Sequence, residues 1–313
     1  DVVVDGLHQR PHLGRCTGVV HRGQVLWVAR VHLLAQPVQR THGPVNGQRQ
    51  QLSFNLSHAT LAAHFPKFRA LKPTLMQHYL WRDLQRHTAQ YPGVTIQRLP
   101  GADSLAYRLT GKDNTLLQQL QQELATLLAE QTRSYLQREY YQQVQLANQQ
   151  QVLIPDHQRL MQDSLTALLP VANALHPKLV NMTLRQSLAY ISHWLQQIPY
   201  QDLSDRQRSA GASFSPPLKL LQENRGDCDS KTVLLAALIR MLLPDVKLAI
   251  IYLPQHAMLA VQLPAQAEDM TVTIEGRQYL LVDPTGPAQL PPGTISPQYQ
   301  LYSRNNQFSY RLL

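Results

Sequence analysis

The sequence is short of cysteines and has no long apolar run. Only two of its 313 residues are cysteines, which excludes a disulfide scaffold and any four-cysteine metal cluster. The best candidate for a membrane span, residues 232–243, is shorter than the roughly 20 apolar residues that a spanning helix needs. It also contains Arg240. We therefore expect no transmembrane segment within this chain.

Acidic and aromatic residues are also scarce. Asp and Glu number 20 against 29 Lys and Arg, which gives a net charge of +9, and aromatic residues make up 7% of the chain. A positive charge favours anionic partners such as nucleic acid or an envelope surface. The basic residues are scattered, however, with no Lys/Arg-rich block and no interleaved aromatic platform. The sequence therefore predicts a basic protein that does not bind nucleic acid.

Hydrophobic residues make up 43% of the chain, so it can bury a core, and its length predicts about two domains. The pattern changes twice and separates an N-terminal α+β domain, a long helical connector and a second α+β domain, at residues 1–112, 113–154 and 155–313. Strands, a helix and the two arms of a hairpin are expected in the first of these at residues 19–31, 71–86, 94–98 and 104–110.

The connector is marked by leucines that recur every three or four residues from Leu116 to Leu128. This spacing indicates one long amphipathic helix or a helical hairpin, capped by Asp113 or Asn114. It fits either a coiled-coil arm or a connector that packs on one of the domains.

The C-terminal region alternates helical and extended patterns. Helices are expected at residues 156–168, 183–197 and 227–243. The last helix is followed by apolar strands at residues 247–253, 257–263, 270–274 and 278–282. A helix followed by several closely spaced strands predicts an antiparallel sheet in an α+β domain.

Cys228 stands where chemistry is expected, at the start of the apolar helix. The N–H groups and dipole of a helix N-terminus stabilise an anion, so a cysteine there favours its nucleophilic thiolate. Gly226 allows a close approach and a sharp turn, and Asp227 or Asp229 can cap the helix. Because both carboxylates oppose a thiolate, a cationic partner becomes more important, and His256 is the candidate for that partner.

His256 and Asp283 supply the remaining chemistry. His256 lies between two expected strands, and Asp283 ends a third, where Pro284 and Gly286 stop it. Together with Cys228 they form the set of nucleophile, base and orienting carboxylate. His256 would accept the thiol proton, and Asp283 would fix the tautomer of the imidazole.

These residues stand in recognisable contexts: IPY at 198–200, FSPPLKLLQ at 214–222, GDCDSK at 226–231, HA at 256–257 and VDPT at 282–285. The pattern resembles the bacterial transglutaminase-like superfamily over roughly residues 180–290. The resemblance implies a papain-like core, in which a helix bearing the cysteine packs on an antiparallel sheet. It makes residues 155–313 the catalytic domain, with a triad of Cys228, His256 and Asp283 and with Gln222 as the candidate side-chain donor to the oxyanion.

The resemblance implies a cysteine peptidase or amidase that acts on a protein or peptide through a thioester, without a cofactor. Met258 and Asp229 depart from the aromatic residues of many relatives and of eukaryotic transglutaminases, which favours hydrolysis over cross-linking. The alternative is a non-catalytic scaffold or binding protein of a bacterial envelope assembly. In either case residues 1–150 would position substrate or bind an envelope partner.

The remaining signals predict no metal site. His8, His12 and Cys16 have helical spacing for ligands, but Pro11 and Gly14 interrupt that helix. Cys16 could pair with Cys228 in an oxidising compartment, whereas the catalytic interpretation requires an unbridged Cys228. The chain starts at Asp1 rather than Met, which predicts a trimmed N-terminus. With the resemblance, this predicts an exported, periplasmic protein.

Overall fold

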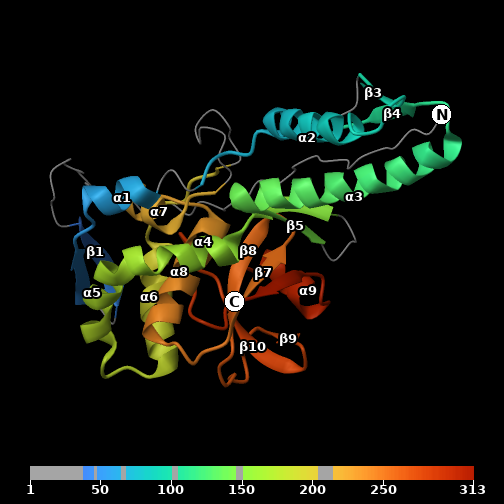
Figure 1. Ribbon diagram of the computed structural model, residues 1–313. Helices are drawn as coiled ribbons and strands as arrows, with labels where there is room; N and C mark the ends of the chain where they lie inside the picture. The colour runs from blue at the N-terminus through green and yellow to red at the C-terminus, as the bar shows by residue number, and fades with distance from the viewer. Residues whose placement is uncertain (1–37, 46–47, 65–67, 101–104, 146–150, 204–213) are drawn as a thin grey trace. The chain divides into compact units, whose positions relative to one another are not determined.

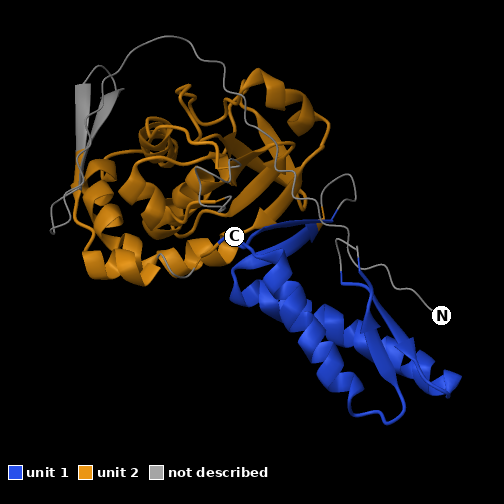
Figure 2. Cartoon of the chain, turned by 90° about the horizontal axis from the view of Figure 1, so that it is seen from above, with its two compact units in different colours: residues 1–12, 70–144, 151–156 blue, residues 13–69, 145–150, 157–313 orange. Residues whose placement is uncertain are grey.

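A computed structural model describes the chain except for residues 1–37, 46–47, 65–67, 101–104, 146–150 and 204–213 (Figure 1). The strands expected at residues 19–31 lie outside the described residues, as do His8, His12 and Cys16. The chain forms two compact units (Figure 2). Unit 1 includes residues 70–144 and 151–156, and unit 2 includes residues 157–313.

Unit 1 is built on two helices that pack against each other, α2 (Pro73–Thr88) and α3 (Asn114–Arg138). Each helix buries a pair of leucines four residues apart, Leu80 with Leu84 and Leu120 with Leu124. Residues four apart lie on one helix face, so each helix buries one stripe. The expected helix at residues 71–86 is confirmed within two residues at each end.

The leucine-rich segment forms one helix rather than a hairpin. It begins after Asp113, whose side chain accepts hydrogen bonds from the N–H groups of Thr115 and Leu116. The expected hairpin is also confirmed, since β3 (Thr95–Arg98) pairs antiparallel with β4 (Tyr107–Thr110). A further two-stranded sheet, β5 (Tyr141–Gln145) with β6 (Gln151–Pro155), follows α3 along the chain.

The central helix of unit 2 is α8 (Cys228–Leu242), and four other helices, α4, α5, α6 and α7, contact it (Figure 1). Every residue from Ser230 to Ile239 is buried. A helix that is apolar on all sides must be covered on all sides, and α8 is apolar on all sides from Val233 to Ile239. The surrounding helices are α4 (His157–Ser164), α5 (Leu169–Leu179), α6 (Leu184–Gln196) and α7 (Pro217–Glu223).

The sheet of unit 2 has five strands in the order β11-β7-β8-β10-β9, and every pairing in it is antiparallel. All six residues of the central strand β8 are buried, and α8 packs against this strand. The expected α+β class with an antiparallel sheet is therefore confirmed. The strands are β7 (Leu248–Leu253), β8 (His256–Val261), β9 (Thr271–Ile274), β10 (Arg277–Val282) and β11 (Ser309–Leu312).

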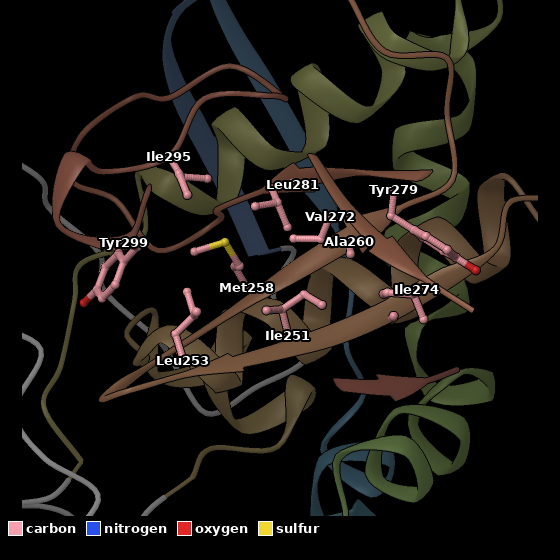
Figure 3. Packing of buried hydrophobic residues seen from close by; sticks show 11 residues of the cluster. Ile251, Leu253, Met258, Ala260, Val272, Ile274, Tyr279, Leu281, Ile295 and Tyr299 are labelled. Atoms are coloured by element: carbon pink, nitrogen blue, oxygen red, sulfur yellow. The ribbon is translucent and has the colours of Figure 1, made fainter. Parts of the chain in front are cut away.

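One apolar cluster lies on a single face of this sheet (Figure 3). It takes alternate residues of β7, β8, β9 and β10, as with Ile251 and Leu253 on β7 and Met258 and Ala260 on β8. Tyr299, from α9 (Pro297–Arg304), belongs to the same cluster. Because side chains alternate along a strand, His256 shares the face of Met258 and Ala260.

Several elements were not anticipated from the sequence. The helix expected at residues 156–168 ends as α4 at Ser164, and a 3-10 turn covers Thr166–Leu168. Helix α5 follows at once despite Pro170 and Pro177, and β11 adds an edge strand to β7. The others are β1 (Val38–Val45), β2 (Gln48–Phe54), α1 (His58–His64), β5, β6 and α9.

Across the described ranges, no helix combines the length and the apolar character needed to cross a membrane. The longest of them, α3, carries glutamines and charged residues along its surface.

Candidate active site

Cys228 is the first residue of α8, and Asp227 is the residue that caps it. Asp227 has extended backbone angles, and its Oδ1 accepts a hydrogen bond of 3.2 Å from the Ser230 N–H. The Ser230 N–H also lies 2.8 Å from Oδ1 of Asp229, but Asp229 is inside the helix, so the cap position belongs to Asp227. The Cys228 side chain is half-buried. The expected helix at residues 227–243 is confirmed, and so is the position of the cysteine in its first turn.

The turn before Cys228 is held by a close backbone approach at Gly226. A Cβ at this residue would lie 2.7 Å from Cδ1 of Leu220, which is itself fully buried. The Gly226 N–H donates to the Pro199 carbonyl, and the Gln201 N–H donates to the Gly226 carbonyl. The close approach expected of this glycine is therefore present, and it docks the turn on the segment that follows α6.

A hydroxyl one turn into α8 connects Cys228 with the strand that carries His256. Oγ1 of Thr232 lies 2.7 Å from the Cys228 carbonyl oxygen and 3.2 Å from the Ala257 carbonyl oxygen. Ala257 directly follows His256 at the start of β8. The first turn of α8 and the beginning of β8 are thus within reach of one hydroxyl group.

The structure brings His256 and Asp283 together. His256 begins β8, Asp283 follows the end of β10, and Nε2 of the histidine lies 2.8 Å from Oδ2 of the aspartate. Both side chains are buried, and Tyr299 stacks on the imidazole at 4.2 Å between ring centroids. This packing fixes the plane of the imidazole ring.

The environment keeps Asp283 ionised. Burial alone would raise the pKa of its carboxyl, but the nearby charge of His256 and the hydrogen bonds to the carboxyl outweigh burial and lower that pKa. One of these bonds comes from the Thr285 N–H to Oδ1 at 3.0 Å. A buried carboxylate paired with an imidazole favours one tautomer and stabilises the imidazolium.

Gln196 supports the loop that carries Asp283. Its Nε2 donates hydrogen bonds of 2.8 Å to the carbonyl oxygens of both Asp283 and Leu290. Gly286 packs against the same residue with a positive φ of 65°, and a Cβ there would meet the Gln196 carbonyl oxygen. The sequence did not identify Gln196, because nothing distinguishes it from the many other glutamines before its partners are known.

A second histidine–carboxylate pair lies beside Cys228 and was not anticipated. His157 of α4 is buried, with Nε2 3.1 Å from Oδ2 of Asp229 and Nδ1 2.9 Å from the Tyr252 hydroxyl. Its ring also packs on Phe214. Burial and the charge of Asp229 raise the pKa of Asp227 well above its ordinary value. The surroundings thus act on both carboxyl groups that flank Cys228: the pKa of Asp227 is raised, and Asp229 pairs with His157.

Gln222, the candidate oxyanion donor, lies near the end of α7, and its side chain is half-buried. Helix α7, which precedes Cys228 in the chain, packs on α8, the helix that Cys228 begins. The role of Gln222 stays a prediction. Within the described part of the chain, no group of three or more His, Cys, Asp or Glu residues is arranged to hold a metal ion.

Comparison with known proteins adds no relative to these observations. No protein-family model and no curated protein matches the chain. A functional assignment therefore depends on the residues around Cys228, His256 and Asp283 and on the geometry that relates them.

Proposed function

We propose that the protein is a thiol hydrolase of the transglutaminase-like type, with a papain-like core, that cleaves an amide bond in a protein or peptide. Cys228 is its nucleophile, His256 its acid and base, and Asp283 the carboxylate that orients His256. The observation that supports this most strongly is the buried pair of His256 and Asp283, in which His256 begins the strand that packs against the helix begun by Cys228.

The first step forms a thioester. Sγ of Cys228 attacks the amide carbonyl carbon while His256 accepts the thiol proton. His256 then gives that proton to the amide nitrogen, the carbon–nitrogen bond breaks and the amine leaves. Because Asp283 occupies the Nε2 side of the imidazole, Nδ1 is the nitrogen that exchanges this proton.

The second step restores the enzyme. His256 accepts a proton from water as the water oxygen attacks the thioester carbonyl carbon. It then gives that proton to Sγ as the carbon–sulfur bond breaks, which releases a carboxylic acid and the Cys228 thiol. The oxyanion of each step would bind the backbone N–H of Cys228, which lies at the N-terminus of α8. The side-chain amide of Gln222 is the proposed second donor.

Hydrolysis is favoured over cross-linking because Met258 and Asp229 replace the aromatic residues expected of cross-linking relatives. Both side chains make contacts within the protein: Met258 is part of the apolar cluster, and Asp229 pairs with His157. We further propose an exported, periplasmic protein in which residues 1–150 contact an envelope partner or the substrate.

Hydroxylamine trapping tests the thioester directly. The full chain, carrying Cys16→Ala so that Cys228 is its one thiol, is incubated with a mixture of unfolded proteins and hydroxylamine. An acyl thioester reacts with hydroxylamine to give peptide hydroxamates, which mass spectrometry detects. We expect hydroxamates from this protein, none after Cys228→Ala, and a loss of about 10²–10⁴-fold after His256→Ala, the usual contribution of a general base.

His176→Ala is the matched control, because His176 is an exposed histidine of α5, and it should leave hydroxamate formation unchanged. Hydroxamates that persist in the Cys228→Ala protein, or a complete absence of hydroxamates and of peptide products from the parent protein, would contradict the proposal. The second outcome would favour the non-catalytic scaffold.

A further inference from the structure

A buried cation lies in α8 that the proposed triad does not use. Lys231 is three residues after Cys228, and its side chain is fully buried, which is rare for lysine. A buried ammonium is costly unless its protons are accepted and its charge is balanced. Its surroundings therefore indicate what the charge is doing there.

The ammonium of Lys231 joins two loops that shape the site. Nζ donates hydrogen bonds to the carbonyl oxygens of Ile198 and Thr285. Thr285 is two residues after Asp283, and its N–H holds the carboxylate of that aspartate. Ile198 precedes Pro199, whose carbonyl holds Gly226 in the turn before Cys228. One ammonium thus links the loop that carries Asp283 with the segment whose Pro199 carbonyl holds the turn before Cys228.

Both hydrogen-bond acceptors of Lys231 are neutral, so they satisfy its protons without balancing its charge. The groups whose anionic forms act on it are Asp283, Asp227 and Cys228, although burial disfavours the anionic form of Asp227. Burial lowers the pKa of Lys231 to about 7, and these three groups act in the opposite direction. Of the other titratable groups at the site, His256 is paired with Asp283, and Asp229 with His157.

We propose that Lys231 is a positioning residue of this site. Its ammonium holds the loop of Asp283 so that the carboxylate stays beside His256, and it supplies the buried positive charge that stabilises the Cys228 thiolate. This inference rests on the proposed function and extends it. It adds a second cation to His256, the partner expected for a thiolate that has carboxyl groups on both sides. A purely structural lysine would hold the loops but would leave the ionisation of the thiol unaffected.

The pH dependence of Cys228 alkylation separates these roles. Iodoacetamide reacts with the thiolate, so its rate against pH reports the ionisation of the thiol. In the Cys16→Ala protein we expect Lys231→Met to slow alkylation at pH 6 at least about tenfold and to move the midpoint to higher pH. Lys231→Arg should keep the midpoint closer to that of the parent, because it keeps the charge.

Lys219→Met is the matched control. Lys219 lies on α7 within 4.0 Å of Glu223, and its side chain is partly exposed. Its removal takes away one positive charge from the same region and should leave the midpoint of Cys228 unchanged, because solvent screens such charges. An unchanged midpoint in a folded Lys231→Met protein would overturn the inference.

A measurement on the unsubstituted lysine covers the case in which the variants do not fold. Coupling between two ionising groups is reciprocal, so a neutral carbamidomethyl group on Cys228 must act on Lys231 as well. The Cε resonance of Lys231 follows its titration in NMR spectra of the Cys16→Ala protein. We expect its midpoint to fall after alkylation. An identical midpoint before and after alkylation would overturn the inference.

The outcomes distinguish this inference from the function on which it rests. If the parent protein yields hydroxamates while Lys231→Met leaves the alkylation profile unchanged, the role of Lys231 is wrong and the hydrolase stands. If Lys231→Met shifts the profile but no hydroxamates form, Lys231 controls a reactive thiol and the hydrolase is wrong.

Discussion

Two carboxyl groups flank Cys228 at the residue scale, and the fold treats each in its own way. Asp227 caps the helix in a buried setting that raises its pKa, which favours the neutral carboxyl. Asp229 pairs with a buried histidine, His157. The sequence thus places two acidic residues beside Cys228, and burial and the charge of Asp229 shift Asp227 toward its neutral form.

Near the N-terminal end of α8, His157 is the residue whose replacement we expect to lower the free energy of unfolding most. His157→Ala removes a buried ring and leaves Asp229 without its imidazole partner, so we expect the free energy of unfolding to fall by about 3 kcal/mol. Urea unfolding followed by tryptophan fluorescence, to which the buried Trp194 of unit 2 contributes, measures the change.

His176→Ala provides the comparison for this measurement, because the histidine it replaces is exposed on α5 of the same unit. We expect it to change the free energy of unfolding by less than about 0.5 kcal/mol. Equal effects of the two substitutions would show that the contacts of His157 with Asp229 and Tyr252 contribute nothing to stability.

The sequence identifies some site residues and not others for a physical reason. Cys228, His256 and Asp283 are visible because each combines a reactive side chain with a local signal, a helix start or a strand end. His157 and Lys231 give no such signal. Their partners are distant in the chain, as with Lys231 and Thr285, and residues of these types are usually exposed.

Strongly patterned segments are the predictable part of the structure at the scale of elements. Helix α8 and strands β7 to β10 lie within a residue or two of their expected ranges, because burial requires continuous apolar runs there. The helix α5 carries Pro170 in its first turn and Pro177 near its end, which obscure its pattern. The edge strand β11 is short and mostly exposed, so its pairing with β7 depends on tertiary contacts.

The packing of α7 against the turn before α8 gives a prediction at this scale. Gly226→Ala places a Cβ 2.7 Å from Cδ1 of Leu220, which cannot move away because it is buried. Overpacking of this kind costs about 1–3 kcal/mol of unfolding free energy. We also expect slower Cys228 alkylation, since the turn that presents the cysteine must shift.

A double-mutant cycle identifies the cause. Leu220→Ala removes the atoms that the new Cβ would meet, so the two substitutions together should cost less than the sum of their separate costs. Additive costs would show that the close approach to Leu220 is not what requires a glycine at residue 226.

The two units differ in what they contribute at the scale of the whole molecule. Unit 2 holds Cys228, His256 and Asp283, and it places α8 against the five-stranded sheet. Unit 1 is a helical pair with small sheets. The net charge of +9 and the scarcity of cysteine describe the whole chain, but the proposed chemistry depends on one thiol and the groups around it.

The rate of Cys228 alkylation at pH 6 tests the central claim most directly. In the Cys16→Ala protein the account predicts that iodoacetamide reacts with Cys228 at least about tenfold faster than with an unfolded cysteine peptide, because a stabilised thiolate persists below the ordinary thiol pKa. It also predicts that His256→Ala removes most of this advantage. A rate no faster than that of the peptide would contradict the account.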